Sequence, residues 1–133
     1  MADTLNHVRE FHKVYRRPIL PSPKFPDQET IDFRIGLIDE EFTELKDAVE
    51  ARDLVGVFDA LLDLCYVIVG MGLEFGFSNI WRAGEIEVHR SNMSKLDDQG
   101  QPILREDGKV LKGPNYTPPD LKSIVESAVN DNG

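Results

Sequence analysis

Apolar residues recur at helical spacing from about Gln28 to Ala51. On a helical wheel of about 100° per residue, one face of this segment is a continuous apolar stripe. The stripe consists of Ile31, Ile35, Ile38, Phe42, Leu45 and Val49. The spacing predicts an amphipathic helix with this face in the core, and Asp27 is placed to cap its start.

A second apolar segment runs from Leu54 to about Phe75. Between Leu54 and Leu73 its only charged side chains are Asp59 and Asp63, which are four residues apart and share a face of the predicted helix. The segment is long enough to span a bilayer, but two central aspartates and acidic flanks argue against that. A helix that is apolar all round is normally central to its fold, so we expect a buried central helix.

Shorter elements are expected around these two helices. The pattern predicts a short helix at about Leu5 to Tyr15, then a proline-rich loop, and another helix from Ser78 to about Lys95. Glycine and Asp-Gly punctuation at 97–113 predicts a loop or small hairpin. A last short helix is expected to begin after Pro118-Pro119.

This order of elements predicts an all-α protein, a four-helix-type bundle with a short C-terminal flap or hairpin. With 133 residues and 41% apolar content, the chain can form one domain with a sizeable core. We therefore expect a single domain over 1–133, with its core at about 28–95 and its flap at about 96–121.

Composition narrows the classes of partner. The net charge of −9 argues against binding to nucleic acid or to an anionic membrane surface. Cys65 is the only cysteine, which excludes a disulfide framework and a thiolate zinc site. The amino-terminal residues are polar and contain no apolar signal core, so we expect a cytoplasmic protein.

The negative charge is concentrated in one part of the sequence. Residues 27–63 contain twelve acidic and three basic side chains, an excess equal to the net charge of the whole chain. Within this region Glu40, Glu41 and Glu44 lie on a second face of the first long helix, among the apolar neighbours Phe33 and Leu37. Such acidic runs are commonly solvated helix faces. Here, however, the apolar frame favours a functional cluster.

Together with Asp59 and Asp63, these glutamates can supply a set of hard oxygen ligands, which suits Mg²⁺ or Mn²⁺. A basic, glycine-containing segment follows in the chain and contains Arg90, Lys95, Arg105, Lys109 and Lys112. Magnesium often shares its coordination with substrate phosphates, and the lysines would meet the remaining oxygens. The combination indicates hydrolysis of a phosphoanhydride.

Four stretches taken together, "DEEFTEL", "DALLDLCYV", "EVHRSNMSKL" and "REDGKVLKGPNYTPPDL", resemble the all-α nucleoside triphosphate pyrophosphohydrolases. This MazG-like superfamily includes dimeric dUTPases and phosphoribosyl-ATP pyrophosphohydrolase. The resemblance covers about Thr30 to Leu121. It implies Mg²⁺-dependent cleavage of a nucleoside triphosphate to monophosphate and pyrophosphate.

The resemblance also assigns residues. Glu40, Glu41 and Glu44 match the metal-binding EExxE pattern of the family, and Asp63 matches the final acid of ExxD. The first acid of ExxD is replaced by Ala60, with Asp59 one residue earlier, so either Asp59 substitutes for it or one ligand is lost. The resemblance further implies that Glu40 or Glu41 is the catalytic base. The positions implied to meet substrate are Asn92, Lys95, Lys109, Lys112 and Tyr116.

The expected function is therefore the removal of pyrophosphate from a (deoxy)nucleoside triphosphate by a homodimer or dimer of dimers. Phosphoribosyl-ATP hydrolysis in histidine synthesis is one alternative, and a non-catalytic, metal-binding helical dimer is another. Phe11 or His12 could contact a base, although packing is the favoured role for both. The sequence does not specify the base or the sugar.

Overall fold

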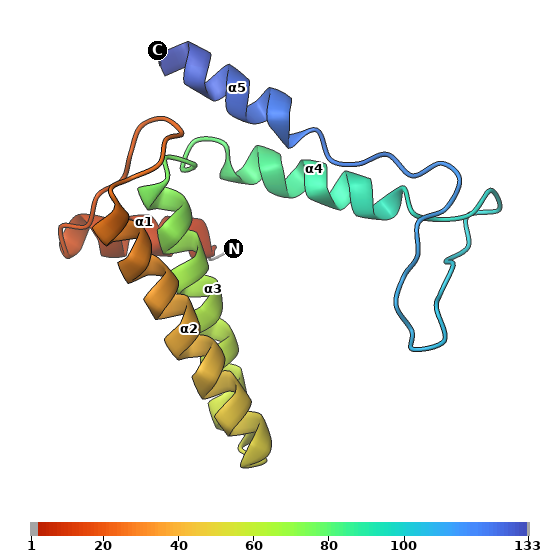
Figure 1. Ribbon diagram of the computed structural model, residues 1–133, viewed down its shortest axis with the longest axis horizontal. Helices are drawn as coiled ribbons and strands as arrows, with labels where there is room; N and C mark the ends of the chain where they lie inside the picture. Colours follow the sequence, from red (N-terminus) through yellow and green to blue (C-terminus); the bar gives the residue numbers. More distant parts are fainter. Residues whose placement is uncertain (1–2, 133) are drawn as a thin grey trace. The chain divides into compact units, whose positions relative to one another are not determined.

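The computed structural model describes residues 3–132 and is all-helical there, apart from one antiparallel bridge between Leu104 and Val110. Five helices follow one another along the chain (Figure 1). They are α1 (Thr4–Val14), α2 (Gln28–Glu50), α3 (Leu54–Glu74), α4 (Trp81–Met93) and α5 (Leu121–Asn132). The chain forms two compact units, Met1–Asn79 and Ile80–Gly133, which are described separately. All the expected helices are present, but the four-helix bundle is not confirmed, since neither unit contains more than three helices.

Helix ends follow local capping chemistry. The Asp27 side chain accepts a hydrogen bond from the Thr30 backbone N–H, which confirms the predicted cap of α2. Asp53 caps α3 in the same way, through the Gly56 N–H. Helix α4 begins at Trp81 rather than Ser78, because Ser78 is buried and accepts two hydrogen bonds from the Arg9 side chain.

In the first unit α2 and α3 pack along each other and α1 packs against α3 (Figure 1). The loop between α1 and α2 returns along the end of α3, where Leu20 N–H donates to the Leu73 carbonyl and Lys24 N–H donates to that of Phe75. Gly76, with φ of 82°, permits this approach, because a Cβ there would collide with the Ser22 carbonyl.

A buried charge joins the elements of the first unit. The Glu74 carboxylate is 0% exposed and pairs with the guanidinium groups of Arg17 and Arg34. Arg34 also donates to the Val67 carbonyl, at 2.7 Å. His12 is buried beside this cluster, and burial lowers its pKa. The structure thus shows His12 in a packing position, as the sequence favoured.

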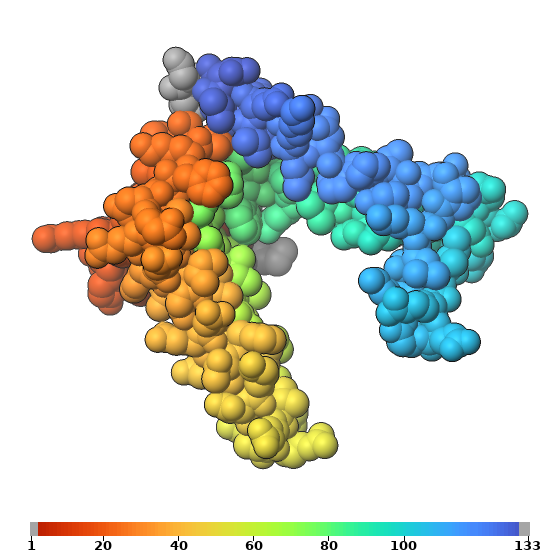
Figure 2. Space-filling view, in the orientation of Figure 1, coloured from red at the N-terminus to blue at the C-terminus, as the bar shows by residue number. Residues whose placement is uncertain are grey.

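Much of the apolar surface of α2 and α3 is not covered within the chain. On α3 an exposed stripe consists of Leu54, Phe58, Leu61, Cys65 and Ile68, at heptad-like spacing. Phe58 is 65% exposed, and Phe42 on α2 is 50% exposed. Figure 2 shows the side chains of α2, coloured orange to yellow, in front of α3.

The expectation that α3 is buried along its length is therefore wrong for a single copy of the chain. Its buried residues are Ala60 and, near its end, Val69, Gly70, Gly72, Leu73 and Glu74. The same holds for α2, whose expected core residues Ile35, Phe42 and Val49 are exposed. The reason is that α1 and α2 each cover only part of the surface of α3.

Among the described residues one helix, α3, has the length and apolar composition of a membrane span. Only 17% of its most apolar window is buried in the chain. Core helices of soluble proteins can have the same length and apolar composition, and α3 contains Asp59 and Asp63 in its middle.

The second unit contains α4, α5 and the segment between them. The predicted hairpin is formed, since Arg105 N–H donates to Lys109 O at 2.8 Å and Gly108 has φ of 89° at the turn. Beyond the hairpin, Ser91 on α4 donates to the Thr117 carbonyl and so holds the returning chain.

Candidate metal centre

Three carboxylates from two helices meet in the first unit. Glu41 and Glu44 lie one turn apart on α2, and Asp63 faces them from α3. One oxygen from each of the three lies within 4.8 Å of the others. The helical spacing and the packing of α2 on α3 thus bring together three of the acids that the sequence singled out.

Burial and repulsion between neighbouring acids disfavour the ionised forms of Glu41 and Asp63. The pKa of Glu41 is raised from 4.5 to about 7 by burial, by a hydrogen bond with Glu44 and by the nearby charges of Asp63, Glu44 and Asp59. The pKa of Asp63 is also raised, again first by burial and then by the charges of Asp59 and Glu44. No basic side chain contributes to either shift. A cation would relieve this repulsion.

One carboxylate oxygen of the cluster lacks a partner among the described residues, as expected if a cation binds there. Glu41 Oε2 is buried and has no hydrogen-bond partner in the described part of the chain. A buried, unpaired carboxylate oxygen is costly unless a ligand satisfies it. Carboxylate oxygens are the preferred ligands of Mg²⁺ and Mn²⁺, so the donor set fits such an ion.

Glu40 and Asp59 stand at the edge of this cluster. Glu40 is exposed and is not one of the three converging acids. Asp59 is also exposed, but its charge reaches both Glu41 and Asp63. Ala60, where the resembling family has glutamate, is only 2% exposed. Position 60 has no acidic side chain in this protein, and Asp59 supplies a negative charge beside the cluster instead.

The five predicted substrate-binding residues all lie in the second unit. Lys112 Nζ lies 4.8 Å from the centre of the Tyr116 ring. Gly113 packs so closely on the Lys95 and Leu96 carbonyl oxygens that a Cβ would collide with them. Lys109 is at the hairpin turn, and Asn92 is exposed near the end of α4. The predicted acidic and basic sets thus belong to different units, and their roles stay predictions.

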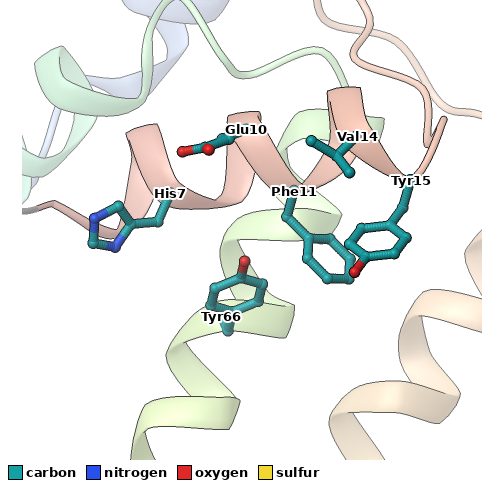
Figure 3. A pocket seen from close by; sticks show the side chains of 6 residues that line it. All are labelled: His7, Glu10, Phe11, Val14, Tyr15 and Tyr66. Atoms are coloured by element: carbon teal, nitrogen blue, oxygen red, sulfur yellow. The ribbon is translucent and has the colours of Figure 1, made fainter.

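The sequence reasoning missed a pocket on the first unit. A shallow cavity of about 340 Å³, wide open to solvent, lies between α1 and α3 (Figure 3). Its lining residues are His7, Glu10, Phe11, Val14, Tyr15 and Tyr66. A signal was available in the pair Phe11 and Tyr15, two aromatic residues four positions apart at the end of a short polar helix.

The chain is similar to proteins that are already known. An uncharacterized protein, L479, of Acanthamoeba polyphaga mimivirus is 36% identical over 132 residues, covering 94% of this chain and 49% of that protein. The chain thus spans about half the length of this relative. The crystal structure of a "putative NTP pyrophosphohydrolase" from Exiguobacterium sp. 255-15 matches with a TM-score of 0.51. This match covers 99% of both chains at 24% identity and shows a shared fold.

The family model of phosphoribosyl-ATP pyrophosphohydrolase matches residues 8–92. The matched region contains Glu41, Glu44 and Asp63, and therefore all three converging acids. It covers more than half of the 133 residues, and the chain belongs to the phosphoribosyl-ATP pyrophosphohydrolase family.

Proposed function

We propose that this protein hydrolyses a (deoxy)nucleoside triphosphate to the monophosphate and pyrophosphate in a Mg²⁺-dependent reaction. The observation that carries the proposal is the convergence of Glu41, Glu44 and Asp63, with Glu41 Oε2 buried and unpaired. Acids arranged in this way, without a basic partner in the described part of the chain, suit a cation that would in turn bind phosphate oxygens. Removal of an unwanted triphosphate from the nucleotide pool is the corresponding role.

The positions of the residues suggest different roles in metal binding, proton transfer and phosphate binding. Glu41, Glu44 and Asp63 would hold the ion, with Asp59 adding negative charge beside them. When bound, Mg²⁺ would lower the pKa of a water molecule and neutralise phosphate charge. Glu40 is four residues before Glu44 on the same helix but outside the converging set, so it is the better candidate for the base. Lys95, Lys109 and Lys112 would bind the phosphate oxygens that the metal leaves free.

A direct assay tests the proposal. The purified protein is incubated with Mg²⁺ and a panel of ribo- and deoxynucleoside triphosphates, and products are separated by anion exchange. We expect monophosphate and pyrophosphate, with formation of both abolished by a chelator. Intact substrates with both Mg²⁺ and Mn²⁺ would contradict the proposal.

Two alternatives each have one observation in their favour. The match to the phosphoribosyl-ATP pyrophosphohydrolase model favours phosphoribosyl-ATP as substrate, so that compound belongs in the panel. Ala60, in place of a family acid, favours a non-catalytic protein that uses a metal only for stability. Replacement of Glu44 by Ala separates the cases: an enzyme loses turnover and stays folded, whereas a structural site loses thermal stability.

We further propose that two copies of the chain associate through the uncovered faces of α2 and α3. The exposed stripe on α3 has the spacing of a helix-packing seam, and a surface of this kind is rarely left open to water. A symmetric dimer, or a dimer of dimers, would cover it.

A further inference from the structure

An open, shallow cavity between α1 and α3 is a feature of the first unit that the metal chemistry does not use. Its volume of about 340 Å³ falls in the range of small-molecule sites. It combines three aromatic rings with two polar side chains, Glu10 and His7, as Figure 3 shows. Apolar walls with a few polar groups are the usual composition of a site for a planar organic ligand.

The aromatic rings form walls at different angles. The centroids of Phe11 and Tyr15 are 4.4 Å apart with their planes at 38°, and Phe11 meets Tyr66 edge to face at 5.5 Å. Phe11 is 41% exposed and Tyr15 is 65% exposed, so both rings retain free surface for a ligand. Proteins that bind single-stranded nucleic acids commonly hold bases by stacking them on such rings.

The cavity is also next to the acids along α3. Tyr66 follows Asp63 by three residues, which is about 4.5 Å of helix rise. Asp59, Asp63 and Tyr66 are spaced i, i+4 and i+7, and therefore share one face of the helix. A ligand whose ring occupied the cavity could extend its sugar and phosphates toward the converging carboxylates.

Glu10 gives the cavity a chemical preference. Glu10 lines the cavity together with Tyr66, and its charge, after burial, helps to raise the pKa of the Tyr66 hydroxyl. An ionised carboxylate only accepts hydrogen bonds. It therefore favours a base edge that carries an amino group, such as that of cytosine, over the carbonyl-flanked edge of uracil or thymine.

We propose that this cavity binds the base of the nucleotide and that Glu10 selects bases with an exocyclic amino group. The proposal rests on the proposed function for its choice of a nucleotide. It assigns Phe11, Tyr15 and Tyr66 to stacking and Glu10 to hydrogen bonding with the amino edge. Specificity is then set on α1, a helix that contributes none of the converging acids.

Binding is tested without catalysis by isothermal titration calorimetry with CMP, AMP and GMP against UMP and TMP, in the absence of metal. We expect at least one amino-bearing monophosphate to bind about 5- to 100-fold more tightly than UMP. The variant Glu10→Gln should lose most of this preference, whereas Glu29→Gln, an exposed acid at the start of α2, should keep it. The variant Phe11→Leu should weaken binding of every base, and Phe25→Leu, outside the cavity, should not.

The outcomes separate this proposal from the proposed function. Equal binding of UMP and the amino-bearing monophosphates, or an unchanged preference in Glu10→Gln, overturns the assignment of Glu10 even if triphosphates are hydrolysed. A base preference that depends on Glu10, without hydrolysis of any triphosphate, supports the cavity and contradicts the enzyme. Thermal melting of each variant confirms that its fold is intact.

Discussion

At the residue scale the central observation is the cluster of Glu41, Glu44 and Asp63. These carboxylates are so close together that a proton or a cation is needed to reduce the repulsion between their charges. Glu41 combines a pKa raised to about 7 with a buried oxygen that lacks a hydrogen-bond partner. Perturbed pKa values of this kind gather at functional sites, although structural clusters also produce them. The neighbouring Glu40 has the same side chain but is exposed, so substitutions of the two glutamates can be compared.

The variants Glu40→Gln and Glu41→Gln should fail in different ways. Loss of a base at position 40 should lower kcat by about 100-fold or more while Mg²⁺ binding is kept. Loss of a ligand at position 41 should weaken Mg²⁺ binding itself. Steady-state kinetics and calorimetric titration with Mg²⁺ distinguish the two results. Equal loss of Mg²⁺ affinity in both variants would show that Glu40 is a ligand.

Metal binding should depend on pH in a direction set by Glu41. The pKa of Glu41 in the folded, metal-free protein is about 7, above the ordinary value of 4.5. Between these two pH values the folded protein therefore keeps a proton on Glu41 that the unfolded chain has lost. This contribution to stability is present below about 4.5 and is lost as the pH rises through about 7. Because Mg²⁺ must displace that proton, its apparent affinity should rise with pH by up to about tenfold per unit and level off above about 7. Titration with Mg²⁺ from pH 5.5 to 8 measures this, and a profile that Glu41→Gln does not flatten would contradict it.

The buried ion pairs of Glu74 should matter more for stability than any exposed pair. Replacement by Ala leaves Arg34 buried without its carboxylate, and breaking a buried pair in this way costs about 3–5 kcal/mol. The control Glu126→Ala removes an exposed pair with Lys122 and should cost less than about 1 kcal/mol. Urea denaturation of both variants gives the comparison. Similar free energies of unfolding for the two would refute the structural role of Glu74.

At the scale of elements, sequence pattern was a good guide wherever the cause is local. The α2 helix has nearly its predicted bounds because its cap and apolar spacing are encoded within a few residues, beginning with Asp27. The meeting of Glu41 and Glu44 with Asp63 likewise follows from spacing on two adjacent helices. The Glu74 cluster was not predicted, because it pairs α3 with arginines 40 and 57 positions away. The cavity was missed for the same reason, since Tyr66 comes from a different helix than Phe11.

The exposed stripe of α3 leads to a prediction about self-association. The variant Phe58→Asp places a charge in the middle of the stripe and should shift the protein toward a monomer, because burial of that charge in an interface is costly. The control Phe25→Asp changes a loop residue that is 80% exposed and lies away from the stripe. Multi-angle light scattering after size exclusion measures the mass. A monomeric wild-type protein would contradict the proposed dimer.

At the scale of the whole molecule, acidic and basic chemistry is divided between the two units. The converging acids belong to Met1–Asn79, and the predicted phosphate-binding lysines belong to Ile80–Gly133. The prediction from sequence gives the acids a role in metal binding and the lysines a role in binding phosphate oxygens. The fold class was predictable from helical spacing, whereas the division into units was not, since the chain shows no long linker at Asn79.

This division predicts that a lysine of the second unit affects substrate use without affecting the metal. The variant Lys112→Gln should lower kcat/KM by about 10- to 100-fold, the usual cost of losing one charge-assisted hydrogen bond. Its Mg²⁺ affinity without nucleotide should not change. Lys122→Gln, an exposed lysine on α5, is the control. If Lys112→Gln retained full activity, the predicted flap would have no role in phosphate binding.

Glycine at position 70 also constrains how this chain can diverge. A Cβ there would overlap the guanidinium of Arg34, so the two positions are coupled through shared space. Descendants of this sequence can gain a side chain at position 70 only after Arg34 has shortened or moved, and that change in turn leaves Glu74 short of a partner. A relative with a side chain at position 70 should therefore lack an extended arginine at position 34, and a relative without Arg34 is expected to have a changed residue at position 74.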